Sequence, residues 1–256
     1  MRIKTNYHTH TVRCQHADGG DREYIEAAIA AGIKTLGFSD HAPMPFDGGY
    51  VSKRRMTMSG MGEYFSALLA LKEEFAGQIE LYIGYEAEYY PKMFGELISV
   101  LRDYPCDYLI LGQHEVEDER WEPYIGRPFE DKKILERHTD MTVEAIETGE
   151  FSYVAHPDIA NFTGDEKFYL RQARRICRAA KAAGLPLEVN ALGLRELRWY
   201  PRGLFFEAAA EEGNALIIGV DAHSPAHFTA PDAVEAIEDC VEFAESFGLE
   251  IVDKLL

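Results

Sequence analysis

The chain has 256 residues, 46% of them hydrophobic, and its formal net charge at pH 7 is −18. This length and apolar content fit one large domain with a sizeable core, such as an α/β barrel. The excess of acidic residues disfavours nucleic acid and anionic membranes as partners.

The N-terminal segment and the cysteines predict a cytoplasmic protein. The segment MRIKTNYHTH turns polar at once, and no stretch approaches the ~20 apolar residues that a membrane-spanning helix needs. The cysteines Cys14, Cys106, Cys177 and Cys240 are scattered and form no CxxC pair. A disulfide framework or a thiolate zinc site is therefore not expected, and a reducing cytosol fits best.

Seven apolar runs alternate with amphipathic segments along the chain. The expected strands are, in order, IKTNYHTH, TLGFSDH, IELYIGYEAE, CDYLILGQHE, FSYVAHPD, LPLEVN and ALIIGVDAH. The expected helices lie near residues 22–31, 60–75, 92–101, 131–147, 166–183, 204–212 and 231–247. Asp21 is the expected N-cap of the first helix, and Gly32 ends it.

This alternation is typical of a parallel sheet covered by helices. Seven such units with no Ser/Gly/Pro-rich linker favour a TIM-like β/α barrel, with parallel strands and outer helices, and a single domain over residues 1–256. The connection at residues 41–60 is long and irregular, and loops of that length inside compact domains tend to be functional.

Side chains that bind metals stand at or just beyond the ends of these expected strands. They are His8, His10 and His16 after the first, His41 after the second, Glu86 in the third, His114 after the fourth, His156 after the fifth, and Asp221 and His223 after the seventh. Because the carboxyl ends of barrel strands meet at one face, these residues are expected to converge there. Imidazole and carboxylate together suit zinc, manganese or iron.

The spacing of two pairs supports a metal site. Residues i and i+2 of a strand point the same way, so His8 and His10 share a side, as do Asp221 and His223. Each signal is weak by itself, because a lone strand-end histidine is more often a hydrogen-bonding group, and a buried carboxylate often pairs with arginine. It is the shared register of seven histidines and two carboxylates that favours metal binding. His138 and His227 fall outside that register, and Cys14 is interpreted as a bystander.

Six motifs resemble the PHP (polymerase and histidinol phosphatase) family of metal-dependent phosphoesterases. They are HTHTVRCQH, FSDHAP, GYEAEYY, LGQHEVE, YVAHPD and GVDAHSP, which follow the family's order through almost the whole chain. The stretches HTHTVRCQHADG, RRM and LEVNALGLRELRWYP resemble the histidinol-phosphate phosphatase branch. The resemblance implies a distorted barrel of seven β/α units.

The resemblance also implies three divalent metal ions (zinc, manganese or iron). The first ion would be held by His8, His10, Glu86 and Asp221. Glu86 would bridge to the second ion, which His114 and His156 complete. The third ion would be held by His16, His41 and His223. Every one of these positions carries a competent ligand in this sequence.

The expected reaction is hydrolysis of a phosphomonoester by a metal-activated hydroxide that attacks phosphorus in line. Clustered cations lower the pKa of bound water from 15.7 toward about 7 and neutralise the phosphoryl oxygens. Glu86, Asp221, His223 and Asp18 make up the expected catalytic group. The proton for the leaving group is expected to come from Asp18 or from a metal-bound water.

Arginine suits phosphate because its planar fork donates two hydrogen bonds. Arg55 and Arg195 are the expected phosphate contacts, with Arg54, Arg198 and Arg202 as alternates, and Asn190 and His41 are expected to face the substrate. Asp18 or Glu115 would meet a substrate amine, and Glu88 shares the strand face of Glu86. Asp158 and Tyr200 are interpreted as structural.

The function predicted from these features is hydrolysis of L-histidinol phosphate to L-histidinol and phosphate, in histidine biosynthesis. The alternative is a PHP phosphoesterase that acts on another small phosphomonoester or a nucleotide. A third hypothesis, a metal-binding regulatory module without activity, is disfavoured because every ligand position is intact.

Overall fold

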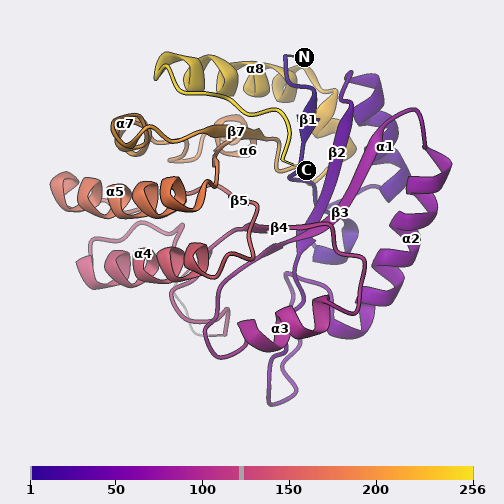
Figure 1. The fold of residues 1–256 in the computed structure, drawn as a ribbon, viewed down its shortest axis with the longest axis horizontal. Coiled ribbons are helices and arrows are strands. Elements are labelled where there is room, and N and C mark those ends of the chain that lie inside the picture. Colours follow the sequence, from indigo (N-terminus) through magenta and orange to yellow (C-terminus); the bar gives the residue numbers. More distant parts are fainter. Residues whose placement is uncertain (1, 121–123, 256) are drawn as a thin grey trace.

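The computed structural model describes residues 2–120 and 124–255. Seven parallel strands stand side by side in chain order, β1 to β7, and helices cover the outer side of the sheet (Figure 1). The strands are β1 Thr5–Asn6, β2 Thr35–His41, β3 Glu80–Ala87, β4 Tyr108–Leu111, β5 Tyr153–Val154, β6 Leu187–Asn190 and β7 Leu216–Gly219. The nearly closed ring of β/α units confirms the predicted architecture.

The helices follow the strands as expected, with one addition. They are α1 Asp21–Ala30, α2 Met61–Glu74, α3 Phe94–Leu101, α4 Lys132–Glu147, α5 Glu166–Ala183, α6 Ala191–Arg195, α7 Gly203–Glu212 and α8 Pro231–Ser246. Three short 3₁₀ turns span Val12–Cys14, Met58–Gly60 and Pro225–Phe228. In the described chain no helix is long and apolar enough to cross a membrane.

The gap between β1 and β7 closes at the end where the strands terminate. There the His10 N–H donates to the Ala222 carbonyl at 2.9 Å, and the Ala222 N–H donates to the His8 carbonyl at 3.1 Å. One step lower, the Val220 N–H donates to Oδ1 of the buried Asn6 at 2.8 Å. The barrel is thus drawn shut around the stretch that contains His8 and His10.

The opposite end of the same gap is covered by the C-terminal segment, which runs close to β1 (Figure 1). Ile251 forms a parallel bridge with Leu216, and the Leu255 N–H donates to the hydroxyl of Tyr7 at 3.4 Å. Val252 and Leu255 pack on a small apolar cluster around Tyr7. The C-terminal segment therefore adds a single bridge to the sheet rather than an eighth strand among the described residues.

The core lies between the strands and their outer helices. In α5 an apolar stripe from Tyr169 to Ala180 is buried in the core. In α8 the stripe runs through Ile237, Val241 and Ala244. Burying each such side chain contributes about 1.5–3 kcal/mol, so the helices hold the strand ends in fixed positions.

Three details differ from the prediction. Gly20, not Asp21, is the N-cap of α1, because the Glu23 carboxylate accepts the Gly20 N–H and closes the first turn. The unpredicted helix α6 follows β6 directly and is capped by the Asn190 side chain. β1 and β5 have only two residues each, because the chain leaves the ladder early where its side chains turn into the barrel mouth.

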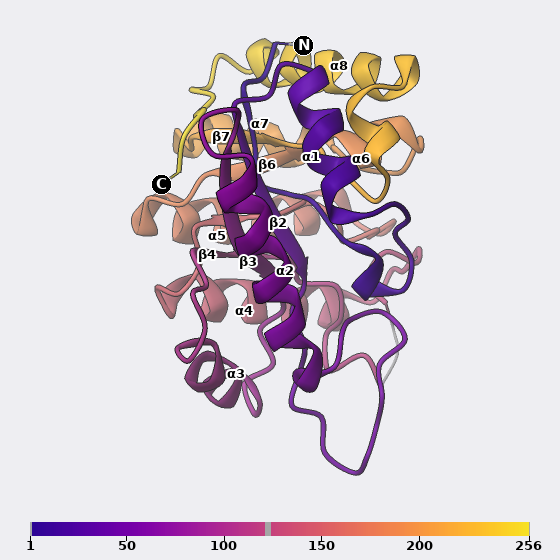
Figure 2. The same cartoon turned by 90° about the vertical axis from the view of Figure 1, so that its right-hand side faces the viewer.

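The long connection between β2 and α2 projects from the body of the barrel (Figure 2). It carries Arg54 and Arg55 and includes the exposed side chains of Tyr50 and Val51. Arg55 returns to the interior and is only 2% exposed. The loop is therefore anchored at its C-terminal end and open at its tip.

Candidate metal centre

All nine predicted ligands converge at the mouth of the barrel. Four groups of three have their ligand atoms within 4.8 Å of one another: His8, His10 and Asp221; His8, Glu86 and His156; His10, His41 and Glu86; His16, His41 and His223. The ninth, His114, has Nε2 3.5 Å from Oε1 of Glu86. Residues more than two hundred positions apart in the chain thus share one site.

Glu86 lies at the centre of this cluster, and its two oxygens face different sets of histidines. Oε2 is 3.7 Å from His8 Nε2, 3.5 Å from His10 Nε2 and 3.0 Å from His41 Nδ1. Oε1 is 2.8 Å from His156 Nε2 and faces His114. The carboxylate therefore presents one oxygen to each of two groups of imidazoles.

A glycine on the neighbouring strand end makes room for this carboxylate. A Cβ at Gly112 would lie 1.9 Å from Oε1 of Glu86, which is far inside any real contact. Gly112 follows β4, which pairs with β3 beside Glu86. The absence of a side chain at this position is a requirement of the site.

Two ligands adopt left-handed backbone conformations that are rare for residues other than glycine. The φ angles are 26° at His156 and 54° at Asp221. Such conformations cost of order 1–3 kcal/mol each and persist where surrounding contacts impose them. Here the His156 N–H is held by Glu188 at 2.8 Å. The strain aims both side chains into the cluster.

The ligand imidazoles are oriented by acceptors behind them. Nδ1 of His8 lies 2.8 Å from Glu188, and Nδ1 of His114 lies 3.0 Å from Glu88. Backbone carbonyls take the same role for His16, at 2.7 Å, and for His223, at 3.0 Å. An acceptor at Nδ1 fixes the tautomer that leaves Nε2 free for a metal.

Glu188 is the most heavily used of these acceptors and was not predicted. It is fully buried and accepts from the His8 ring, the His156 N–H and the Asn190 amide. A Cβ at Gly219 would lie 1.7 Å from its Oε1, so the next strand must carry glycine there. The detectable signal was a carboxylate inside the otherwise apolar run LPLEVN.

The carboxylates of the cluster are held ionised by the imidazoles. Burial raises the pKa of Glu86, but the neighbouring imidazoles, led by His114, outweigh it and hold that pKa well below its usual value. Burial raises the pKa of Asp221 as well, and His8 and His10 lower it well below its usual value. Conversely, burial lowers the pKa of His10, yet carboxylates raise it to about 9. The site therefore requires positive charge.

The cluster also contains buried polar atoms without hydrogen-bond partners among the described residues. They are Nε2 of His8, both ring nitrogens of His10, Nδ1 of His41, Nδ1 of His156, Oε2 of Glu86 and Oδ1 of Asp221. Native proteins rarely leave so many buried polar atoms unpaired in one place. Divalent cations would satisfy both these atoms and the demand for positive charge, so the residues fit metal ions.

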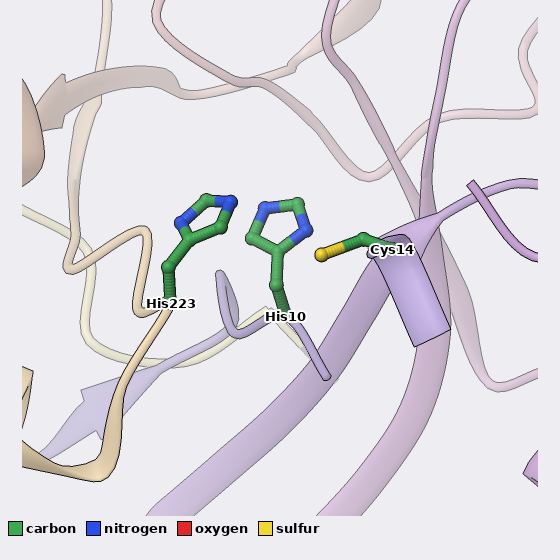
Figure 3. Close-up of side chains that lie close together, drawn as sticks. All are labelled: His10, Cys14 and His223. Atoms are coloured by element: carbon green, nitrogen blue, oxygen red, sulfur yellow. The ribbon is translucent and has the colours of Figure 1, made fainter. Parts of the chain in front are cut away.

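Cys14 lies closer to the ligands than its interpretation as a bystander suggests. The rings of His10 and His223 stack with centroids 4.0 Å apart, and the Cys14 sulfur lies beside them (Figure 3). Its Sγ and ring nitrogens of both histidines are within 4.8 Å of one another. Burial and the nearby Asp40 raise the pKa of the thiol to about 12, which keeps it protonated and a poor ligand.

A cavity of about 420 Å³ opens above the cluster. Eight of the nine predicted ligands, all except His8, line it and form its floor. Its outer wall is formed by residues of loops and of α6: Arg54, Tyr124, Ile159, Leu192, Glu196, Arg198 and Tyr200. The volume suits a small metabolite.

The two arginines that were predicted to bind phosphate, Arg55 and Arg195, are paired with protein carboxylates in the structure. Arg55 lines the cavity but is buried, and its guanidinium donates to Glu88, Glu119 and the Ala42 carbonyl. Arg195 is not among the residues lining the cavity, and its Nε donates to Asp232 at 2.7 Å. Of the three alternates, Arg54 and Arg198 do line the cavity, whereas Arg202 is not among its described lining residues.

Three further residues that were predicted to meet the substrate contact other parts of the site instead of lining the cavity. Asn190 donates to Glu188 at 2.9 Å and to Asp221 at 3.2 Å, so it positions a ligand. Asp18 is exposed, and its N–H donates to the His223 carbonyl. Glu115 is buried and accepts from Arg54 and the Tyr90 hydroxyl. None of these three is among the residues that line the described cavity.

A parallel β/α barrel with this cluster at its mouth defines a metal-binding hydrolase-type site. The sequence model of the PHP domain matches residues 6–192, so the chain belongs to the PHP domain family.

Relatives and solved structures agree with this membership. A protein of Deinococcus radiodurans named "Probable histidinol-phosphatase" is 32% identical over 243 residues, which cover 91% of this chain and 92% of the relative. The histidinol-phosphatase of Bacillus subtilis is 24% identical, over 86% of this chain and 93% of the relative. A Lactococcus lactis histidinol phosphate phosphatase, solved with zinc, L-histidinol and phosphate, superposes with a TM-score of 0.75 at 19% identity, over 97% of this chain and 95% of that one.

Proposed function

We propose that this chain is a metal-dependent phosphomonoester hydrolase that converts L-histidinol phosphate to L-histidinol and phosphate. The observation that carries the proposal is the cluster of nine candidate ligands, eight of which line a cavity of metabolite size. The family membership and the names of its full-length relatives support the same substrate. As a biosynthetic enzyme with free cysteines, it would act as a single domain in the cytoplasm.

We further propose three divalent ions, divided as the family resemblance implies. His8, His10 and Asp221 would share the first with Oε2 of Glu86, and Oε1 would serve the second together with His114 and His156. His16, His41 and His223 would hold the third. The two-sided contacts of Glu86 support this division, because each oxygen faces a separate group of imidazoles.

Bound divalent cations would lower the pKa of water and neutralise the phosphoryl oxygens during attack on phosphorus. The protein's own residues hold the geometry. Glu188 and Glu88 fix the rings of His8 and His114, and Asn190 holds the Asp221 carboxylate. Ile159 and Leu192 line the wall where the organic part of the substrate would lie and exclude water from it.

Arg54 and Arg198 are the proposed contacts for the anionic substrate, in place of Arg55 and Arg195. Both line the cavity and keep part of the guanidinium exposed, at 43% and 30% of the side chain. In an acidic protein, a local pair of arginines at the entrance attracts an anion that the overall charge repels. Arg55 would instead lock the loop to β3 through Glu88.

The experiment is a phosphate-release screen over a panel of phosphomonoesters that includes L-histidinol phosphate and nucleotides. Metal-free protein would be reconstituted separately with zinc, manganese or iron, and metal-free protein would be the control. We expect the highest kcat/KM for L-histidinol phosphate. A higher kcat/KM for another ester would move the substrate to that class and leave the phosphoesterase chemistry in place.

A further inference from the structure

Tyr200 is a buried phenol on the wall of the cavity, although its sequence position suggested a structural role. It is 1% exposed and lies beside the ligand His156, with ring centroids 6.2 Å apart. Its ring lies against Gly193 of α6, where a Cβ would come within 2.4 Å of Cδ2. The short helix thus gives the phenol a fixed place between the metal ligands and the outer wall.

The hydrogen bonds of Tyr200 leave its proton free to point into the cavity. Nη1 of Arg198 donates to the Tyr200 hydroxyl at 2.8 Å, and Nε of Arg198 donates to Glu196 at 2.8 Å. A guanidinium has no acceptor, so the phenolic hydrogen cannot be given to Arg198. Among the described residues, the hydroxyl has no protein acceptor for that hydrogen.

We propose that Tyr200 is a catalytic residue that donates its proton to the leaving-group oxygen. This proposal rests on the phosphomonoesterase activity proposed above but not on the identity of the alcohol. A substrate whose phosphoryl group lies on the floor directs its ester oxygen toward the wall, where Tyr200 stands. Arg198 is its positioning residue and stabilises the phenolate that proton transfer creates.

The step balances without any further reactant. The oxygen of water forms a bond to phosphorus, the bond from phosphorus to the ester oxygen breaks, and its electron pair goes to that oxygen. The ester oxygen takes the Tyr200 proton and leaves as an alcohol. The phenolate then recovers a proton from solvent, which has received the proton that the attacking water lost.

The structure favours Tyr200 over two other donors. Asp18, the donor predicted from sequence, is exposed and is not part of the described cavity lining. Tyr124 is the other tyrosine of that lining, but no guanidinium of the described residues donates to its hydroxyl. Among the described residues that line the cavity, Tyr200 alone combines a hydroxyl on the wall with a guanidinium that donates to it.

The test is Tyr200→Phe, assayed on the metal-loaded protein with phosphate esters of graded leaving-group pKa, from alkyl phosphates to 4-nitrophenyl phosphate. Loss of a general acid matters only when the leaving group is a poor one. We expect kcat/KM to fall about 10²-fold for alkyl phosphates and less than about threefold for 4-nitrophenyl phosphate. A plot of log kcat/KM against leaving-group pKa therefore becomes steeper in the variant than in the parent.

Tyr169→Phe is the matched control, because Tyr169 is a buried tyrosine of α5 outside the cavity lining. We expect it to keep the parent slope. An equal loss for all esters in Tyr200→Phe, or a steepened slope in Tyr124→Phe instead, would overturn the proposal.

Two further outcomes keep the proposals separable. If Tyr200→Phe does not retain metal, the parent protein alone is tested. An enzyme that protonates the leaving group shows a shallow dependence of log kcat/KM on leaving-group pKa. A steep dependence in the parent would therefore contradict a proton donor at Tyr200. If another alkyl ester surpasses L-histidinol phosphate, the substrate assignment fails while the comparison of slopes still tests Tyr200.

Discussion

The floor and the wall of the cavity differ in where their side chains come from and in how firmly these are held. Floor residues such as His156 and Glu86 stand on or next to strands and are buried, and the His156 N–H is held by the Glu188 carboxylate behind it. Wall residues such as Arg54 and Glu196 stand on loops or just after a short helix, with 43% and 46% of their side chains exposed. A rigid floor of this kind holds the candidate ligands in place, whereas the exposed side chains of the wall are free to meet a substrate.

The largest effect is expected on the floor, from Asp221→Asn. Oδ1 of Asp221 lies 3.4 Å from His8 Nε2 and 3.2 Å from His10 Nε2, and an amide removes the negative charge that a cation needs. We expect kcat/KM to fall by at least about 10³-fold, with bound metal reduced. Metal analysis and phosphate release measure both, and full activity with full metal content would remove Asp221 from the ligand set.

The second prediction concerns Arg55→Met, at the buried arginine that joins the loop after β2 to Glu88. Removing this guanidinium leaves Glu88 and Glu119 buried without their cation. Breaking a buried ion pair on one side costs about 3–5 kcal/mol of the free energy of unfolding. Urea unfolding followed by circular dichroism measures it, and Arg195→Met, at a partly exposed pair with Asp232, is the control. If the two variants are equally stable, Arg55 is not the anchor.

Behind the floor, Glu188→Gln should weaken metal binding without changing any ligand. The amide keeps the shape of the side chain but accepts poorly from the His8 ring and the His156 N–H at once. We expect metal affinity to fall about 10- to 100-fold. Competition with a fluorescent chelator measures the affinity, and Glu196→Gln on the wall is the matched control, expected to bind metal as the parent does.

The smallest effect is expected on the wall, from Arg54→Gln. Its loss removes a partly exposed contact to an anionic substrate, so KM should rise about tenfold while kcat changes little. Arg195→Gln, outside the described cavity lining, should leave both constants within about twofold. Steady-state phosphate release gives kcat and KM for both variants. A larger rise of KM in Arg195→Gln than in Arg54→Gln would support Arg195 as the phosphate contact.

Much of the floor could be predicted because ligand chemistry and strand register are both local in sequence. The pairs His8 with His10 and Asp221 with His223 were visible as i, i+2 patterns, and barrel topology then placed them together. The role of Glu188 was not predicted, because a carboxylate in an apolar strand does not indicate which histidine ring it contacts. Asn190 lies against the Asp221 carboxylate, because a side chain near a strand end can face a ligand as easily as a substrate.

The wall could not be predicted in the same way. Arg54 and Arg55 are neighbours in sequence, yet one opens to the cavity and the other is buried against Glu88. Arg195 and Arg198 lie within one turn, but the chain leaves α6 between them and sends only Arg198 to the wall. Loop direction decides such choices, and it depends on packing rather than on residue type.

The sequence by itself indicated the seven β/α units, the nine candidate ligands and the end of the barrel where they meet, because periodicity and residue chemistry can be read along the chain. Only the tertiary structure decided which carboxylates stand behind the histidines, which arginines reach the cavity, and that Tyr200 lies on its wall beside Arg198. Those outcomes depend on distances between segments far apart in the chain, and these are set only when the barrel closes and its core packs.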